Sequence, residues 1–126
     1  MANILVVEDD EQVRVLAVSI VEELGHTAQS AANMDEALAL LATDQVFELL
    51  FTDLGLSGHD QAGLALAVEA VRQREKLPVL YTTGQAVTDG MKALFVDNAS
   101  LLPKPYTFDQ LAAALKEVLK VKLCKS

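Results

Sequence analysis

Short apolar runs that each end in a polar side chain are the feature that most constrains this chain. There are four such runs, at residues 4–7, 48–53, 79–83 and 101–104. Unbroken apolar runs of this length are typical of parallel strands covered on both faces. The carboxyl ends of parallel strands lie at one edge of a sheet, so we expect their polar ends to meet there. In chain order these ends are Glu8 with Asp9, then Asp53, Thr83 and Lys104.

Segments with helical spacing of apolar residues separate the runs. Helices are predicted at residues 11–24, 33–42, 87–96 and 107–122, with one more that ends near residue 74, and a short edge strand at residues 26–30. Five strands that alternate with five helices predict an α/β fold: a parallel sheet with helices on both faces and right-handed crossovers. Of the two plausible strand orders we expect the flavodoxin-like order 2-1-3-4-5, doubly wound. At 126 residues the chain is predicted to form one domain, residues 1–126.

The first helix is predicted to present two different surfaces. Its inner stripe is expected to consist of apolar residues at helical spacing, namely Val13, Leu16, Ala17, Ile20 and Leu24. Val15 and Val18 would then lie off this stripe, near the polar edge of the sheet. An exposed apolar pair there predicts a docking surface. In the last helix the expected inner stripe is Phe108, Leu111, Leu115 and Val118.

Composition excludes several classes of function. The net charge of -8 argues against direct binding to nucleic acid. No apolar stretch approaches the roughly 20 residues of a membrane helix, and no basic segment leads into a signal-type apolar stretch, so we expect a cytoplasmic protein without membrane insertion. A single cysteine, Cys124, provides neither a disulfide framework nor a thiolate metal site.

The acids at the predicted edge indicate a divalent cation. Carboxylates held close together repel each other unless a cation lies between them. Mg²⁺ prefers oxygen ligands, needs few from the protein and keeps several waters. We expect Asp9 and Asp53 as direct ligands, Glu8 as a ligand through water, and the backbone carbonyl of Gly55 as a further ligand.

The hydroxyl and the lysine at the same edge indicate that the site also binds a phosphoryl group. Carboxylates serve as phosphoryl acceptors, and Asp53 is placed to attack phosphorus. Such a transfer depends on positioning and charge neutralisation, which Lys104 and the Thr83 hydroxyl would provide. The backbone N–H groups of Leu54 and Gly84 would bind the remaining phosphoryl oxygens.

In these motifs the chain resembles a receiver domain of bacterial two-component response regulators. The resemblance covers essentially the whole sequence and rests on residues 4–10, 51–53, 78–84 and 102–105. It implies Asp53 as phospho-acceptor, Thr83 as switch hydroxyl and Lys104 as the family's lysine. We choose Thr83 over Thr82 because it lies five residues after Pro78 and directly before a small residue.

The resemblance also implies partners and chemistry. The donor would be a histidine kinase or a histidine phosphotransfer protein, the cofactor Mg²⁺, and the peptide bond before Pro105 cis. The domain would assist its own phosphorylation and dephosphorylation without being an enzyme in its own right. Residues 83–86 most resemble receivers fused to hybrid histidine kinases. The chain departs from the family at Ser57, where proline is usual, and in a glycine-rich loop at residues 55–63, which we expect to be flexible.

Three other functions are alternatives to this one. An aspartyl phosphatase would carry a second acid two residues after Asp53, where Gly55 stands. A flavodoxin would carry a phosphate loop after the first strand, where the acidic residues 8–11 would repel a phosphate. A degenerate receiver that acts only as a protein-binding module remains an alternative, which labelling by a phosphodonor distinguishes.

Overall fold

Five parallel strands form the centre of the molecule. The computed structural model describes residues 2–55, 62–84, 88–96 and 99–124, with side chains as far as residue 119. The strands are β1 (Asn3–Val7), β2 (Thr27–Ala31), β3 (Leu49–Asp53), β4 (Val79–Thr83) and β5 (Ala99–Pro103). All neighbours pair in parallel, and the order β2-β1-β3-β4-β5 confirms the predicted doubly wound, flavodoxin-like sheet with β2 at an edge.

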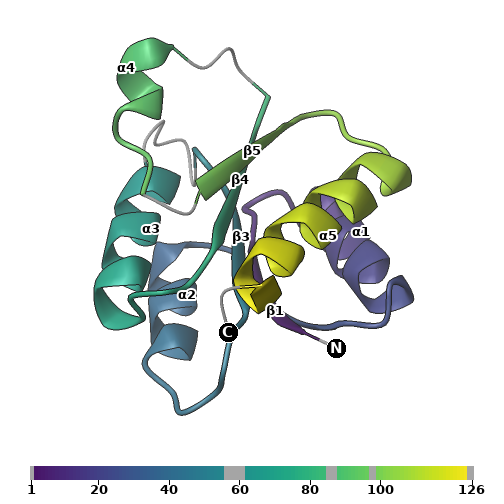
Figure 1. Cartoon of the computed structure of the whole chain (residues 1–126), viewed down its shortest axis with the longest axis horizontal. Coiled ribbons are helices and arrows are strands. Elements are labelled where there is room, and N and C mark those ends of the chain that lie inside the picture. The colour runs from purple at the N-terminus through teal and green to yellow at the C-terminus, as the bar shows by residue number, and fades with distance from the viewer. Residues whose placement is uncertain (1, 56–61, 85–87, 97–98, 125–126) are drawn as a thin grey trace.

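The described part of the chain contains five helices, and four of them cover the sheet. The five are α1 (Glu11–Glu23), α2 (Met34–Leu41), α3 (Ala62–Gln73), α4 (Asp89–Lys92) and α5 (Phe108–Cys124). Helices α1 and α5 lie on one face of the sheet, and α2 and α3 lie on the other (Figure 1). None of the helices in the described part of the chain is long and apolar enough to cross a membrane.

Helix α4 is much shorter than predicted. It begins after the Thr88 cap and ends at Lys92, and none of its residues is buried. A helix of one turn is unfavourable unless packing stabilises it, because nucleation orders several residues for one hydrogen bond. Part of the predicted helix, residue 87, lies outside the described residues.

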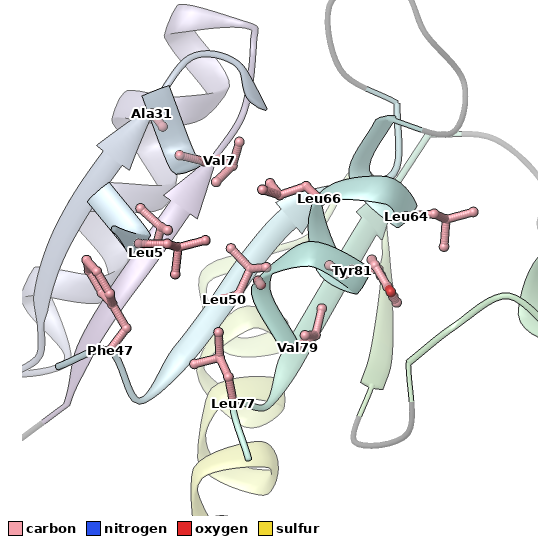
Figure 2. Packing of buried hydrophobic residues seen from close by; sticks show 14 of the residues in the cluster. Leu5, Val7, Ala31, Phe47, Leu50, Leu64, Leu66, Leu77, Val79 and Tyr81 are labelled. Atoms are coloured by element: carbon pink, nitrogen blue, oxygen red, sulfur yellow. The ribbon is translucent and has the colours of Figure 1, made fainter. Parts of the chain in front are cut away.

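Successive side chains of each strand point to opposite faces of the sheet, so the core consists of two clusters. Ile4 and Val6 pack with α1 and α5, whereas Leu5 and Val7 pack with α2 and α3. Figure 2 shows the second cluster, where Leu50 of β3 lies among side chains from neighbouring strands and from α3. Because both faces of the sheet are covered, β1, β3 and β4 are buried almost throughout, as the unbroken runs predicted.

Two predicted inner stripes need correction. Leu16 is 53% exposed and Phe108 is 40% exposed, so neither belongs to the core. The buried stripe of α1 instead runs through Ala17, Ile20 and Val21, which rotates it away from Leu16. Val18 is half-buried and packs against the core, so Val15 and Leu16 form the exposed apolar pair of α1.

Side-chain caps stand at the starts of α2 and α5. At α5, the Gln110 N–H donates to Thr107 Oγ1 at 3.1 Å and the Thr107 N–H donates to Gln110 Oε1 at 2.9 Å. At α2, the Glu36 N–H donates to Asn33 Oδ1, but the Glu36 carboxylate accepts from the Ala32 N–H, one residue before the expected partner.

One arginine binds the end of α2 and the loop that leads from α2 to β3. Arg74, just after α3, donates to the backbone carbonyls of Leu41, Thr43 and Gln45 at distances of 2.9, 3.0 and 2.6 Å. Its guanidinium carbon also lies 5.3 Å from the centre of the Phe47 ring, within cation–π range. Arg74 therefore holds the chain between α2 and β3, together with Asn3, whose Nδ2 donates to the Val46 carbonyl at 2.9 Å.

Candidate functional site

The polar ends of the strands converge at the carboxyl edge of the sheet, as predicted. Glu8 follows β1, Asp53 is the last residue of β3, Thr83 is the last residue of β4 and Lys104 follows β5. The Lys104 N–H donates to the Thr83 carbonyl at 2.8 Å, which extends the contact between β5 and β4 to the site. Strand pairing therefore brings together residues that lie up to 96 positions apart.

Lys104 links the two most buried acids of the site. Its Nζ lies 2.8 Å from Asp53 Oδ2 and 2.5 Å from Glu8 Oε1. Burial alone would lower the pKa of Lys104, but the hydrogen bonds to Asp53 and Glu8 outweigh burial and raise it above its ordinary value. The lysine is therefore a fixed cation beside the Asp53 carboxylate.

The pKa of the Glu8 carboxyl is shifted by its surroundings. Burial raises its pKa to about 7, and the neighbouring Asp53 carboxylate acts in the same direction, while Lys104 opposes both. The backbone of Glu8 is held from two sides: its N–H donates to the Ala31 carbonyl at 3.1 Å, and its carbonyl accepts from Arg14 Nη1 at 3.0 Å. Sequence patterns gave no sign of this contact from Arg14.

The acids are grouped as a cation site requires. Glu8, Asp9 and Asp53 each offer an oxygen, and these oxygens lie within 4.8 Å of one another. Asp9 is exposed, whereas Glu8 and Asp53 are buried. Three carboxylates beside a single lysine leave negative charge to be offset, and an all-oxygen donor set suits a hard cation such as Mg²⁺. The residues present therefore fit the predicted ion, although the Gly55 carbonyl as a ligand stays a prediction.

One expected amide donor is wrong. The Leu54 N–H donates to the Thr82 carbonyl at 2.9 Å, because pairing of β3 with β4 continues one residue past Asp53. The amide that faces the carboxylate is that of Gly55, whose N–H donates to Asp53 Oδ1 at 3.3 Å. Gly84 is exposed at the end of β4, and its role as a donor stays a prediction, as does the role of the buried Thr83 hydroxyl.

Gly63 has a role that the sequence did not suggest. The sequence pattern places it in the loop at residues 55–63, yet it lies within α3 and its N–H donates to the Leu54 carbonyl at 2.7 Å. A Cβ at this position would lie 1.9 Å from the Asp53 carbonyl oxygen. Only glycine lets the helix approach the end of β3 so closely, so Gly63 helps to fix the position of Asp53. A glycine that opens a helix after a strand is a signal for such close approach.

The segment after Lys104 borders the same site. The peptide bond between Lys104 and Pro105 is cis, as expected. Tyr106 follows, with its ring centre 6.0 Å from that of Phe51 on β3. Burial raises the pKa of Tyr106, and the charge of Glu8 acts in the same direction, which places the tyrosine close to the acids.

Comparison with known proteins agrees with this geometry. The family model of the response regulator receiver domain matches residues 4–116. A putative NtrX-like response regulator of Rickettsia bellii is 28% identical over 123 residues, which are 96% of this chain and 25% of that protein. The crystal structure of NtrX from Brucella abortus is similar, with a TM-score of 0.88 and 31% identity over 98% of this chain and 28% of the other.

A receiver from a hybrid histidine kinase is also similar. The crystal structure of the CckA receiver has a TM-score of 0.77 and 27% identity over 93% of this chain and 98% of the other. The chain spans about a quarter of the length of the curated relatives it matches.

Proposed function

The chain belongs to the family of response regulator receiver domains, and from this premise we propose that Asp53 accepts a phosphoryl group from a phosphohistidine donor. The observation that carries the proposal is the position of Lys104, whose ammonium group contacts the Asp53 carboxylate at 2.8 Å. A buried carboxylate beside a fixed cation suits a nucleophile whose target carries negative charge. We assign residues 1–126 to one receiver domain, which contains the whole site.

The proposed transfer exchanges one bond to phosphorus for another. A carboxylate oxygen of Asp53 attacks phosphorus, the P–N bond of the phosphohistidine breaks, and its electron pair stays with the donor imidazole. Lys104 offsets the charge of a phosphoryl oxygen, and the Gly55 N–H, which donates to the Asp53 carboxylate at 3.3 Å, is an amide donor beside it. Mg²⁺, held by Asp9 and Asp53 and through water by Glu8, would offset the charge of another oxygen.

Labelling of the purified chain tests this proposal. Incubation with acetyl phosphate and Mg²⁺ should add one phosphoryl group to the wild-type chain, measured as intact mass, and none to Asp53→Asn. Asp10→Asn is the matched control, because Asp10 lies outside the acid cluster and its side chain caps α1 through the Val13 N–H, a role that asparagine also fills. Equal labelling of Asp53→Asn would contradict the assignment. An unlabelled wild-type chain would favour the alternative, a receiver that only binds a partner.

We assign docking of the donor protein to the exposed apolar pair of α1. Receiver domains interact with histidine kinases or phosphotransfer proteins, and Val15 and Leu16 are 58% and 53% exposed on the helix that follows the acids. An apolar pair beside the site suits a transient interface with a phosphohistidine protein. Val15→Glu should therefore abolish transfer from a phosphotransfer protein that labels the wild type, and spare labelling by acetyl phosphate.

The control for this experiment lies on the opposite face of the sheet. Val68 on α3 is 54% exposed, so Val68→Glu adds the same charge at a similar exposure away from α1. It should leave both reactions unchanged. If Val15→Glu and Val68→Glu behave alike, α1 is not the docking helix.

A further inference from the structure

A small cavity lies beside the acids, on the face of the sheet covered by α1 and α5. Its volume is about 10 Å³, and most of its wall is apolar, contributed by residues such as Val6, Ala17 and Phe51. Two polar side chains, Glu8 and Thr82, also line it. The cavity is therefore a mostly apolar space into which two hydrogen-bonding groups are built.

Both polar groups have an atom without a partner. Glu8 is 3% exposed and Thr82 is 4% exposed. Glu8 Oε2 and Thr82 Oγ1 are buried and have no hydrogen-bond partner among the residues that the structure describes. The other carboxylate oxygen of Glu8 is bound by Lys104. Buried polar atoms are nearly always hydrogen-bonded, to protein or to ordered water, so each of these two atoms requires an explanation.

Strand alternation explains why Thr82, and not its neighbour, reaches this cavity. Leu80 on β4 and Phe51 on β3 belong to the cluster beneath α1 and α5, and Tyr81 belongs to the opposite cluster. Successive side chains of a strand point to opposite faces. Thr82 therefore shares the face of Glu8, whereas Thr83, the proposed switch hydroxyl, starts from the other face.

We propose that the cavity binds one ordered water that joins Glu8 Oε2 to Thr82 Oγ1. The volume is close to the lower bound for one water, and a buried water needs two or more polar partners, which these two atoms provide. The water donates to the carboxylate oxygen and accepts from the threonine hydroxyl or donates to it, so both orphan atoms are satisfied. Thr82 thereby becomes a positioning residue, which fixes one oxygen of Glu8 while Lys104 fixes the other.

The sign of a melting shift tests the water bridge. Valine has the shape of threonine without the hydroxyl. If the water joins the two groups, Thr82→Val removes a hydrogen-bond partner and lowers the melting temperature by about 4 °C. If no water is bound, the same change removes an unsatisfied hydroxyl and the melting temperature stays the same or rises. The measurement is thermal unfolding without divalent cation, and either of these last results overturns the proposal.

Measuring Thr82→Val in a second variant distinguishes the water-mediated contact from simple packing of Thr82. Glu8→Met replaces the carboxylate with an apolar side chain of similar length. In that background Thr82→Val should no longer lower the melting temperature, because the water has lost its carboxylate partner. An equal loss in both backgrounds would show that Thr82 acts through packing alone and would contradict the proposal.

The positioning role has its own readout. Titration with Mg²⁺ alone should show a several-fold weaker affinity for Thr82→Val, and Thr82→Ser, which keeps the hydroxyl, should restore most of it. Weakening that serine does not restore would contradict a role for the hydroxyl. This part rests on the proposed metal site, whereas the melting comparison does not depend on Mg²⁺ or on phosphorylation of Asp53. Failure of the two proposals can therefore be distinguished.

Discussion

The two edges of the same sheet are built on opposite principles. At the amino edge, backbone groups are paired with side chains: Arg74 binds three carbonyls, and the Asn3 N–H donates to Glu48 Oε2 at 2.7 Å. At the carboxyl edge, acids are brought together against their repulsion, with Lys104 as the cation between Glu8 and Asp53. The contacts at the amino edge therefore stabilise the fold. The carboxyl edge carries excess negative charge, which destabilises the fold until a bound cation offsets it. Changes at the two edges should therefore have opposite consequences.

The largest effect on stability is expected at the amino edge. Arg74→Ala removes three charge-assisted hydrogen bonds and the contact with Phe47, which should lower the free energy of unfolding by roughly 3 kcal/mol and the melting temperature by about 10 °C. Labelling by acetyl phosphate at 20 °C should be unchanged, because the site lies at the other edge. Thermal unfolding and intact mass measure the two effects.

Arg72 provides the matched control. It lies in the last turn of α3, two residues before Arg74, but among the residues that the structure describes its ion pair is with Glu69 on the same helix, and its side chain is 71% exposed. Arg72→Ala should melt close to the wild type, because exposed pairs contribute little. A similar loss in both variants would mean that positive charge, and not the three carbonyl contacts, stabilises this edge.

A smaller effect of opposite sign is expected at the carboxyl edge. Asp9→Asn removes one of three clustered carboxylates, so in EDTA it should melt roughly 2 °C higher than the wild type. Mg²⁺ should raise the melting temperature of the wild type through linkage and raise that of the variant much less. Asp10→Asn should respond to Mg²⁺ as the wild type does. An identical Mg²⁺ response in wild type and Asp9→Asn would refute the metal site.

The smallest expected effect concerns His26 at the amino edge. Burial lowers the pKa of His26, and its Nδ1 accepts a hydrogen bond from the Ala2 N–H at 3.0 Å, while the charge of Glu48 opposes the shift. Because the folded state binds this proton less readily than the unfolded state, stability is lost as the pH falls through the ordinary pKa of histidine. His26→Gln should lose less stability than the wild type between pH 7 and pH 5, by about 1 °C in melting temperature since the ring is partly exposed. A wild-type stability that rises toward pH 5 relative to the variant would reverse the sign of this interpretation.

The sequence predicts the fold and the convergence of the site, but only part of its detail. The apolar runs and their polar ends suffice for the strands and for Glu8, Asp9, Asp53 and Lys104, because strand periodicity is a local property. The strand order was a choice between two plausible arrangements, and the structure confirms the one expected. Contacts between different helices and strands leave weaker signals in the sequence. From the sequence alone, Arg74 cannot be told from the other charged residues, and Gly63 cannot be told from a loop glycine. The Leu54 amide was misassigned because the pairing of β3 with β4 extends one residue farther than the apolar pattern.

Helix faces were predicted less well for a similar reason. Leu16 lies four residues before Ile20, and Val21 lies four residues after Ala17. Both therefore fit the helical spacing, and only packing against the sheet and α5 decides which of them is buried. In α4 the pattern indicated a longer helix, but without a buried side chain the structure retains one turn.

Direct identification of the phosphorylated residue tests the central claim, that the carboxyl edge presents Asp53 as the phosphoryl acceptor. The wild-type chain would be labelled with acetyl phosphate and Mg²⁺ and then treated with borohydride, which reduces an aspartyl phosphate to homoserine. Peptide mass spectrometry then locates the homoserine. The proposed function predicts homoserine at position 53 and unmodified aspartate at positions 9 and 10. Homoserine at position 9 or 10, or a phosphoryl group on a residue outside the site, would contradict it.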